Sequence, residues 1–218
     1  MWAMQPRFER DLPAFVERAA ELGFGAIELN HSMDHQHLDA FRSGVALPAT
    51  SVHAQAPLER HSRWGWNRDL NLASVDEEER ALAVRYALRS VDLASEVGAG
   101  AVVVHLGQIA SGALDGELRR RALFEAGTTG GDIWAHAGAE AAQVRAQLAP
   151  PCLAQAHRSL DDLATAAQAA GVAIGLECRQ HYHQFPLPEE AVMLLADYPP
   201  EVAGYWHDSG HAEVQDRL

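Results

Sequence analysis

The sequence predicts an α/β fold, a TIM-type (β/α)8 barrel of which this chain holds about six of the eight β/α units. Three observations predict it. An amphipathic helix, a glycine and a short apolar strand recur as a unit along the chain. Each strand ends in a polar residue. No glycine-rich phosphate turn follows an early strand, which argues against an open doubly wound sheet. Alternating helices and strands are typical of parallel sheets.

The first unit begins with a helix whose apolar residues recur at helical spacing, and it ends at Gly23. A strand is expected over residues 24–30. A short helical stretch over residues 35–43 then leads to a second strand over residues 50–54.

The next helix is expected to start at Ser74, because Ser74-x-x-Glu77 has the spacing of a capping box. Its apolar face repeats at helical spacing until Gly98 ends it. The run Ala-Val-Val-Val-His-Leu over residues 101–106 is expected to be the strand that follows.

Two more units complete the pattern. A helix is expected from near Ser159 to Gly171, followed by a strand over residues 172–178. A last helix, opened by Pro188, precedes a strand over residues 202–208.

Two segments fall outside this repeat. The stretch between Gly107 and Pro151 is mostly helical and is broken at residues 127–131, so we interpret it as an elaboration of one βα loop and its helix. Residues 1–4 stand where a first strand should end, and counting them gives six strands. Because a closed barrel needs eight, we expect a single domain over residues 1–218, clipped at its first strand and truncated at its C-terminus.

Composition restricts the function. The net charge of −13 weighs against nucleic acid as a partner without excluding it, because binding phosphates requires a basic face. No apolar run is long enough to span a membrane. Cys152 and Cys178 are isolated, which favours a reducing compartment, and we expect a cytoplasmic location.

The strand-end polar residues are expected to converge. Side chains alternate between the two faces of a strand. With Glu177 on the inner face, Gly175 shares that face; with His105 inward, Val103 joins it. The same phase holds in the other strands, and the residues that it brings to the carboxyl mouth are Glu28, His53, His105, Glu177 and Asp208.

This convergence indicates a divalent metal. Glu177 and Asp208 would repel each other unless a cation lay between them. Carboxylate and imidazole ligands suit Mn²⁺, Mg²⁺ or Co²⁺, and also Zn²⁺. His211 stands three residues after Asp208 at a strand-to-helix turn, where Gly210 permits a sharp bend. His207 is expected to point away by its phase.

Two motifs carry a resemblance to a known family. Residues 174–178, Ile-Gly-Leu-Glu-Cys, and residues 207–212, His-Asp-Ser-Gly-His-Ala, resemble motifs of the xylose-isomerase-like TIM barrels. Residues 51–54 and 104–107 resemble the third- and fourth-strand motifs of that superfamily. The superfamily contains sugar isomerases and epimerases and also the endonuclease-IV type of apurinic-site nuclease.

The resemblance implies roles for the strand-end residues. Glu177 and Asp208 would be metal ligands, and Glu177 would also move a substrate proton. His211 would bind the metal in a nuclease or a substrate oxygen in an epimerase. His53 and His105 would line the substrate pocket or hold additional metal ions. The family's remaining ligands come from a seventh and an eighth strand, which this chain lacks.

The remaining candidates for substrate binding are Glu28, Arg179 and Trp66, and each has a simpler interpretation. Glu28 could belong to a structural ion pair. Arg179 could be solvated, together with His181 and His183. Trp66 could form an apolar wall for a sugar or lie free on its loop.

The site residues themselves have simpler interpretations too. His53 and His105 could be core histidines, and Glu177 a buried ion-pair partner. Asp208 and His211 could do no more than cap a helix.

These observations lead to three hypotheses. The first is a metal-dependent isomerase or epimerase that acts on a sugar or small hydroxy-carbonyl compound through an enediolate. The second is an endonuclease-IV-type phosphodiesterase that uses several metal ions. The third is a non-catalytic or truncated barrel. The first implies a carbohydrate-like small-molecule partner, and a homo-oligomer is possible.

Overall fold

The main sheet has five strands, all parallel, in the order β1-β2-β5-β6-β7. The computed structural model describes residues 5–217. The main strands are β1 (Ile27–Leu29), β2 (Ala49–His53), β5 (Ala101–Val104), β6 (Ala173–Glu177) and β7 (Ala203–Trp206), and a separate hairpin pairs β3 (Arg60–His61) with β4 (Gly65–Trp66). All five lie where the sequence predicts strands. The predicted strand end at residues 1–4 lies outside the described residues. Within the described part the sheet is open, as expected of an incomplete barrel.

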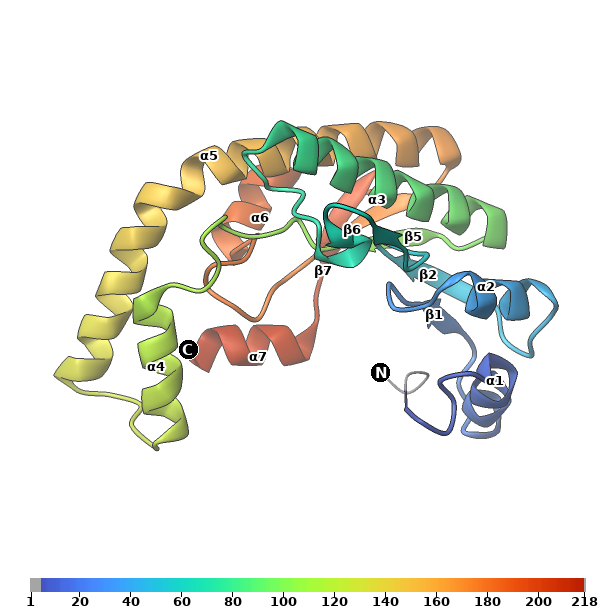
Figure 1. The fold of residues 1–218 in the computed structure, drawn as a ribbon, viewed down its shortest axis with the longest axis horizontal. Coiled ribbons are helices and arrows are strands. Elements are labelled where there is room, and N and C mark those ends of the chain that lie inside the picture. The colour runs from blue at the N-terminus through green and yellow to red at the C-terminus, as the bar shows by residue number, and fades with distance from the viewer. Residues whose placement is uncertain (1–4, 218) are drawn as a thin grey trace.

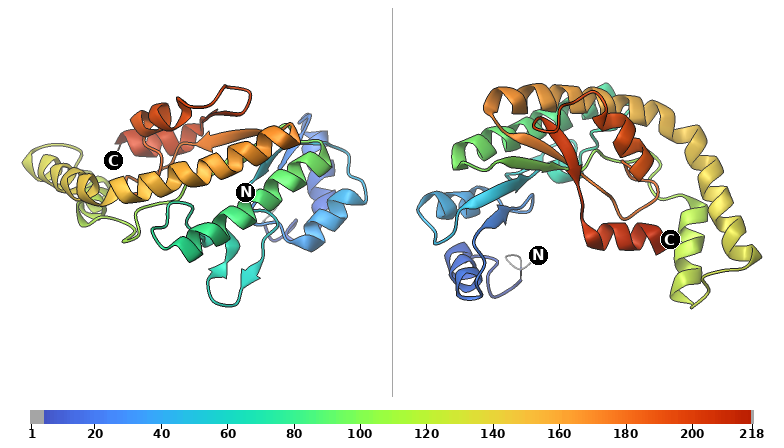
Figure 2. Two further views of the ribbon diagram at one scale, coloured as in Figure 1. Left: turned by 90° about the horizontal axis from the view of Figure 1, so that it is seen from above. Right: turned by 180° about the vertical axis from the view of Figure 1, so that it is seen from behind.

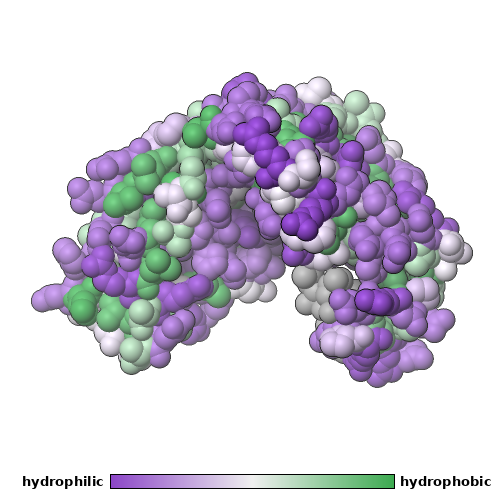
Figure 3. Space-filling model, in the orientation of Figure 1, coloured by the Kyte–Doolittle hydropathy of each residue, from purple (hydrophilic) through white to green (hydrophobic). Residues whose placement is uncertain are grey.

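Two long helices cover one face of this sheet (Figures 1 and 2). The helices are α1 (Leu12–Glu21), α2 (His35–Arg42), α3 (Glu77–Val97), α4 (Asp115–Glu125), α5 (Asp132–Ala170), α6 (Pro188–Leu195) and α7 (Ser209–Arg217), with a 3-10 turn at Asn67–Asp69. The helices α3 and α5 run side by side across the sheet (Figures 1 and 2). The molecule is hollowed beneath the sheet, and mostly hydrophilic residues surround the hollow (Figure 3).

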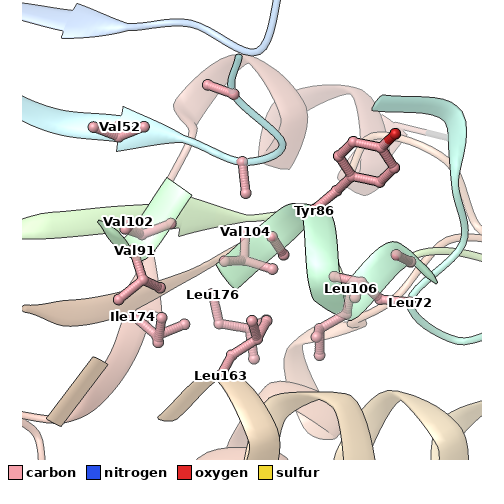
Figure 4. Close-up of a cluster of buried hydrophobic side chains, with 14 of the residues drawn as sticks. Val52, Leu72, Tyr86, Val91, Val102, Val104, Leu106, Leu163, Ile174 and Leu176 are labelled. Atoms are coloured by element: carbon pink, nitrogen blue, oxygen red, sulfur yellow. The ribbon is translucent and has the colours of Figure 1, made fainter. Parts of the chain in front are cut away.

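The core lies between the sheet and these two helices, which confirms the predicted phase of the strands. The outward side chains of β5 and β6 are almost completely buried: Val102, Val104, Ile174 and Leu176 are each at most 1% exposed. Figure 4 shows them clustered with Val91 of α3 and Leu163 of α5. Burying a side chain of this size contributes about 1.5–3 kcal/mol to stability.

The predicted capping box at Ser74 is wrong. Helix α3 begins at Glu77, and the carboxylate of Asp76 caps it by accepting from the backbone N–H groups of Glu78 and Glu79 at 2.9 and 3.5 Å. The Ser74 hydroxyl instead accepts from the Asp76 N–H at 3.1 Å. An aspartate two residues further on is an equally strong cap, so it sets the helix start.

The predicted start of the third long helix is also wrong. Helix α5 begins at Asp132 rather than near Ser159, and it runs through Pro150 and Pro151. Prolines remove backbone hydrogen bonds and bend a helix, and α5 is visibly bent (Figure 1). Buried residues on both sides of the prolines keep it continuous. Its first half forms a hairpin with α4, which is the elaboration that the sequence predicts.

A substitution at Gly107 tests how tightly the loop after β5 is packed. Its φ is +106°, and a Cβ there would lie 2.0 Å from Oδ1 of Asn71. We expect Gly107→Ala to lower the free energy of unfolding in urea by about 2 kcal/mol or more, from backbone strain and steric clash together. Gly127 is the matched control, because it has a φ of +80° and open space around it. Equal losses in both variants would contradict the predicted clash.

Candidate metal centre

The carboxyl ends of the strands bring five predicted residues together. Two groups have ligand atoms within 4.8 Å of one another: His53 with His105 and Glu177, and Glu177 with Asp208 and His211. Glu177 ends β6 and belongs to both groups. The predicted convergence of these side chains is therefore present, and their roles as ligands stay predictions.

Glu177 is a buried carboxylate surrounded by imidazoles. It is 5% exposed, and its Oε2 contacts Nε2 of His105 and lies 3.4 Å from Nε2 of His53. Burial raises the pKa of Glu177, but its contacts with the His105 and His53 imidazoles outweigh burial and hold the pKa well below its usual range. The group is therefore ionised at neutral pH, as both a metal ligand and a base must be.

His53 is oriented for a ligand. Its Nδ1 lies 2.8 Å from the carbonyl oxygen of Ala54, which can only accept, so Nδ1 carries the proton. The lone pair on Nε2 then faces Glu177 and His105. A ligating histidine usually donates its other ring nitrogen in this way.

The nitrogen Nε2 of His105 has more neighbours within hydrogen-bond distance than one ring nitrogen can bind. It contacts Oε2 of Glu177, lies 2.5 Å from Nη1 of Arg179 and lies 3.1 Å from Nε2 of His53. A ring nitrogen offers one proton or one lone pair. Burial is the main cause that lowers the pKa of His105 to about 4, so the ring is neutral at neutral pH. A divalent cation held by the imidazole lone pairs and the Glu177 carboxylate would give these crowded groups a common partner. The donor set therefore fits a metal.

Asp208 and His211 do cap helix α7, but the cap uses only some of their polar atoms. Oδ1 of Asp208 accepts from the backbone N–H of His211 at 2.8 Å, which leaves Oδ2 for another partner. Nδ1 of His211 donates to the carbonyl oxygen of Cys178 at 2.9 Å. This protonated nitrogen is the one that lies 3.8 Å from Oε1 of Glu177. Nε2 of His211 therefore keeps its lone pair, as Nε2 of His53 does, and could serve a metal ion or a substrate oxygen.

His31 belongs to the cluster and was missed by the sequence analysis. Its Nδ1 lies 3.1 Å from Nδ1 of His53. Burial and the nearby charges of His53, His105, Arg68 and Arg179 lower the pKa of His31 to about 3. His31 lies two residues beyond the end of β1, in the loop, and the alternation of side chains along a strand places only residues inside the strand.

Two predicted binding residues lie elsewhere. Glu28 is on the inner face, where its Oε2 accepts from the Ser51 hydroxyl at 2.7 Å, but neither donor group includes it. Trp66 is 41% exposed on β4, and the Arg60 guanidinium lies 6.0 Å from its ring centroid. The roles of both residues in binding remain predictions. His207 is exposed beside Tyr205, away from the cluster, as its phase predicts.

The solvated interpretation of the loop after β6 is wrong for two residues. Arg179 is 8% exposed and points its guanidinium at His105 and Glu177. Burial lowers the pKa of Arg179, against the charges of Glu177, Cys178 and Asp208, which raise it. His183 is 7% exposed, and its Nδ1 lies 2.8 Å from Oε2 of Glu117 on α4. His183 is buried against helix α4, whereas Arg179 is buried against the strand-end residues that it contacts.

The parallel sheet, the helices on its outer face and the polar cluster at its strand ends define a TIM-barrel protein. The profile of the xylose isomerase-like TIM barrel family matches residues 16–217, and the chain belongs to that family. No curated protein matches the chain. Among residues 5–217, no helix is both long and apolar enough to cross a membrane.

Solved structures with the same fold include several described as epimerases. A D-tagatose 3-epimerase-like protein is 23% identical, with 90% of this chain and 60% of that one covered and a TM-score of 0.59. A 3-keto-D-glucoside 4-epimerase from E. coli is 15% identical, with 98% and 69% covered and a TM-score of 0.62. An L-ribulose 3-epimerase is 14% identical, with 94% and 57% covered and a TM-score of 0.61. At these identities the likeness concerns the fold, and the chain spans 60% of the first of these proteins.

Proposed function

We propose that the protein is a metal-dependent isomerase or epimerase of a sugar or small hydroxy-carbonyl compound. The observation that supports this most directly is Glu177, a buried, ionised carboxylate within common reach of Asp208 and His211. The fold shared with epimerases agrees with the proposal.

The chemistry follows from what each group can do. A divalent ion held by Glu177 and Asp208 would polarise the substrate carbonyl and lower the pKa of the neighbouring C–H. The free oxygen of the Glu177 carboxylate accepts that proton, and the C–H electron pair becomes the double bond of an enediolate. Nε2 of His211 accepts a hydrogen bond from a substrate hydroxyl. A proton returned to the opposite face gives an epimer, and one returned to the neighbouring carbon gives an isomer.

Proton exchange with solvent is the direct test. The full-length protein is incubated in D₂O with Mn²⁺ or Co²⁺ and a ketose such as D-tagatose or D-fructose. We expect deuterium to appear at a carbon next to the carbonyl of the ketose. NMR measures the incorporation. Chelation with EDTA should stop the exchange, and added Mn²⁺ should restore it. Exchange that is unchanged in EDTA would contradict the proposed metal dependence.

One observation favours a second candidate, hydrolysis of a phosphodiester at apurinic sites. His53, His105 and Glu177 form a second donor group that shares Glu177 with the first, as a site for several metal ions requires. The net charge of −13 disfavours a nucleic-acid substrate. Nicking of an abasic duplex by the zinc-loaded protein, without exchange on any ketose, would establish this second function in place of the first.

A further inference from the structure

A cavity of about 300 Å³ opens beside the metal centre. This volume is at the lower end of the range for small-molecule pockets. The lining residues that matter here are His31, Gln55, Arg68, His105 and Arg179. Among the described residues that line it, Asp69 is the one acid, and its side chain is 66% exposed, 4.0 Å from Nε of Arg68.

Arg179 brings a buried positive charge to this cavity. The carboxylates that act on it are Glu177 and Asp208, and the nearer of them, Glu177, lies 3.5 Å from Nη1. Two carboxylates balance the charge of one divalent cation. If both serve a metal, the Arg179 guanidinium keeps no counter-charge of its own, and an unpaired buried charge is costly. The missing negative charge must then come from the ligand.

Two other side chains on this cavity favour a polar, anionic ligand. Arg68 is a second guanidinium on the same cavity, held by a 2.8 Å hydrogen bond from Nη1 to the Ser32 hydroxyl. Gln55 is 5% exposed, and its Oε1 is buried without a hydrogen-bond partner among the described residues. An unpaired buried acceptor is unfavourable, and a ligand hydroxyl would satisfy it.

We propose that this cavity binds the charged end of an anionic, hydroxylated substrate, whose carboxylate or phosphate oxygens accept hydrogen bonds from Arg179 and Arg68. A hydroxyl of the same substrate donates to Oε1 of Gln55. Guanidinium groups suit such oxyanions because they offer paired donors. The inference rests on the proposed function, because it takes Glu177 and Asp208 as ligands of a cation.

Calorimetry on the Mn²⁺-loaded protein tests the ligand class with three probes. D-fructose is neutral, D-fructose 6-phosphate carries a phosphate and 5-keto-D-gluconate carries a carboxylate. We expect one of the anionic probes to bind at least about tenfold tighter than D-fructose, because hydrogen bonds to charged groups are the stronger ones. The tighter of the two identifies the oxyanion. If D-fructose binds as tightly as both, the inference is wrong.

Substitutions of single arginines test which side chains bind the anionic probe. Arg179→Gln should weaken the preferred anionic probe about 10- to 100-fold and change D-fructose binding little. Arg63→Gln is the matched control, because Arg63 is an exposed arginine paired with Glu78 outside the cavity. If Arg179→Gln does not fold, Arg68→Gln at its partly exposed position should still weaken the anionic probe about threefold or more. Unchanged affinity in every folded variant would overturn the inference.

Elemental analysis separates this inference from the function on which it rests. If the unaltered protein takes up Mn²⁺ and exchanges protons on a neutral ketose without preferring an anion, the proposed function stands and the anion site does not. If it takes up no Mn²⁺, both fail.

Discussion

Glu177→Gln should abolish metal uptake by the protein. The amide cannot replace an ionised ligand, and Glu177 is shared by both donor groups. We expect the affinity for Mn²⁺ to fall at least about 100-fold, beyond the loss typical of outer-shell changes. Proton exchange on a ketose should fall by about 10²–10⁴, because the same substitution removes the base. Elemental analysis and NMR in D₂O measure the two losses.

Glu28→Gln is the matched control for this experiment. Glu28 is also an acid on the inner face of a strand, but it bonds to Ser51 and belongs to neither donor group. It should keep its metal, and any loss of exchange without loss of metal would report the predicted role of Glu28 in substrate binding. Asp208→Asn should lose metal as Glu177→Gln does. Full metal content in both the Glu177 and Asp208 variants would remove the basis for the proposed site.

Arg145→Ala should destabilise the fold by about 3–5 kcal/mol. The Arg145 and Glu190 side chains are 7% and 8% exposed, and they pair through two contacts of 2.5 and 3.0 Å. Nε of Arg145 also donates to the carbonyl oxygen of Tyr182 at 2.7 Å. Removing the arginine therefore leaves a buried carboxylate and a half-buried carbonyl without their partner. Urea unfolding followed by circular dichroism measures the change.

A more exposed pair elsewhere in the fold shows what burial contributes. Arg119 pairs with Glu140 between α4 and α5, with side chains 50% and 33% exposed. Arg119→Ala should cost at most about 1 kcal/mol, because water solvates both groups when the pair is broken. Losses of equal size in the Arg145 and Arg119 variants would show that burial does not set the energy of the first pair.

The strands and their phase could be predicted because both are local properties. An apolar run with a polar last residue fixes which side chains share a face, so His53, His105 and Glu177 were placed together from sequence alone. Helix starts were harder to predict. Two prolines indicate a break in most contexts, but burial of the residues around Pro150 and Pro151 keeps α5 continuous.

Contacts between distant segments could not be predicted. His183 is buried by its contact with Glu117 of α4, and Arg179 by its contacts with His105 and Glu177. No periodicity in the sequence encodes either set of contacts. His31 was missed for a different reason. It lies two residues beyond the end of β1, and the alternation of side chains along a strand places only residues inside the strand.

Three sets of hydrogen bonds anchor the loop after β6 to neighbouring elements. Arg145 binds the carbonyl oxygens of Tyr182 and Gln184, Glu117 accepts from the Tyr182 N–H, and an isolated bridge joins Gln184 to Gln108. These anchored residues follow Arg179 by three to five positions, so we expect Arg179 to be held in place before any ligand arrives. A ligand that enters beside it meets a preorganised donor, so little conformational entropy is lost on binding. We expect the hairpin of α4 and α5, which contributes no residue to either donor group, to act on affinity through this rigidity.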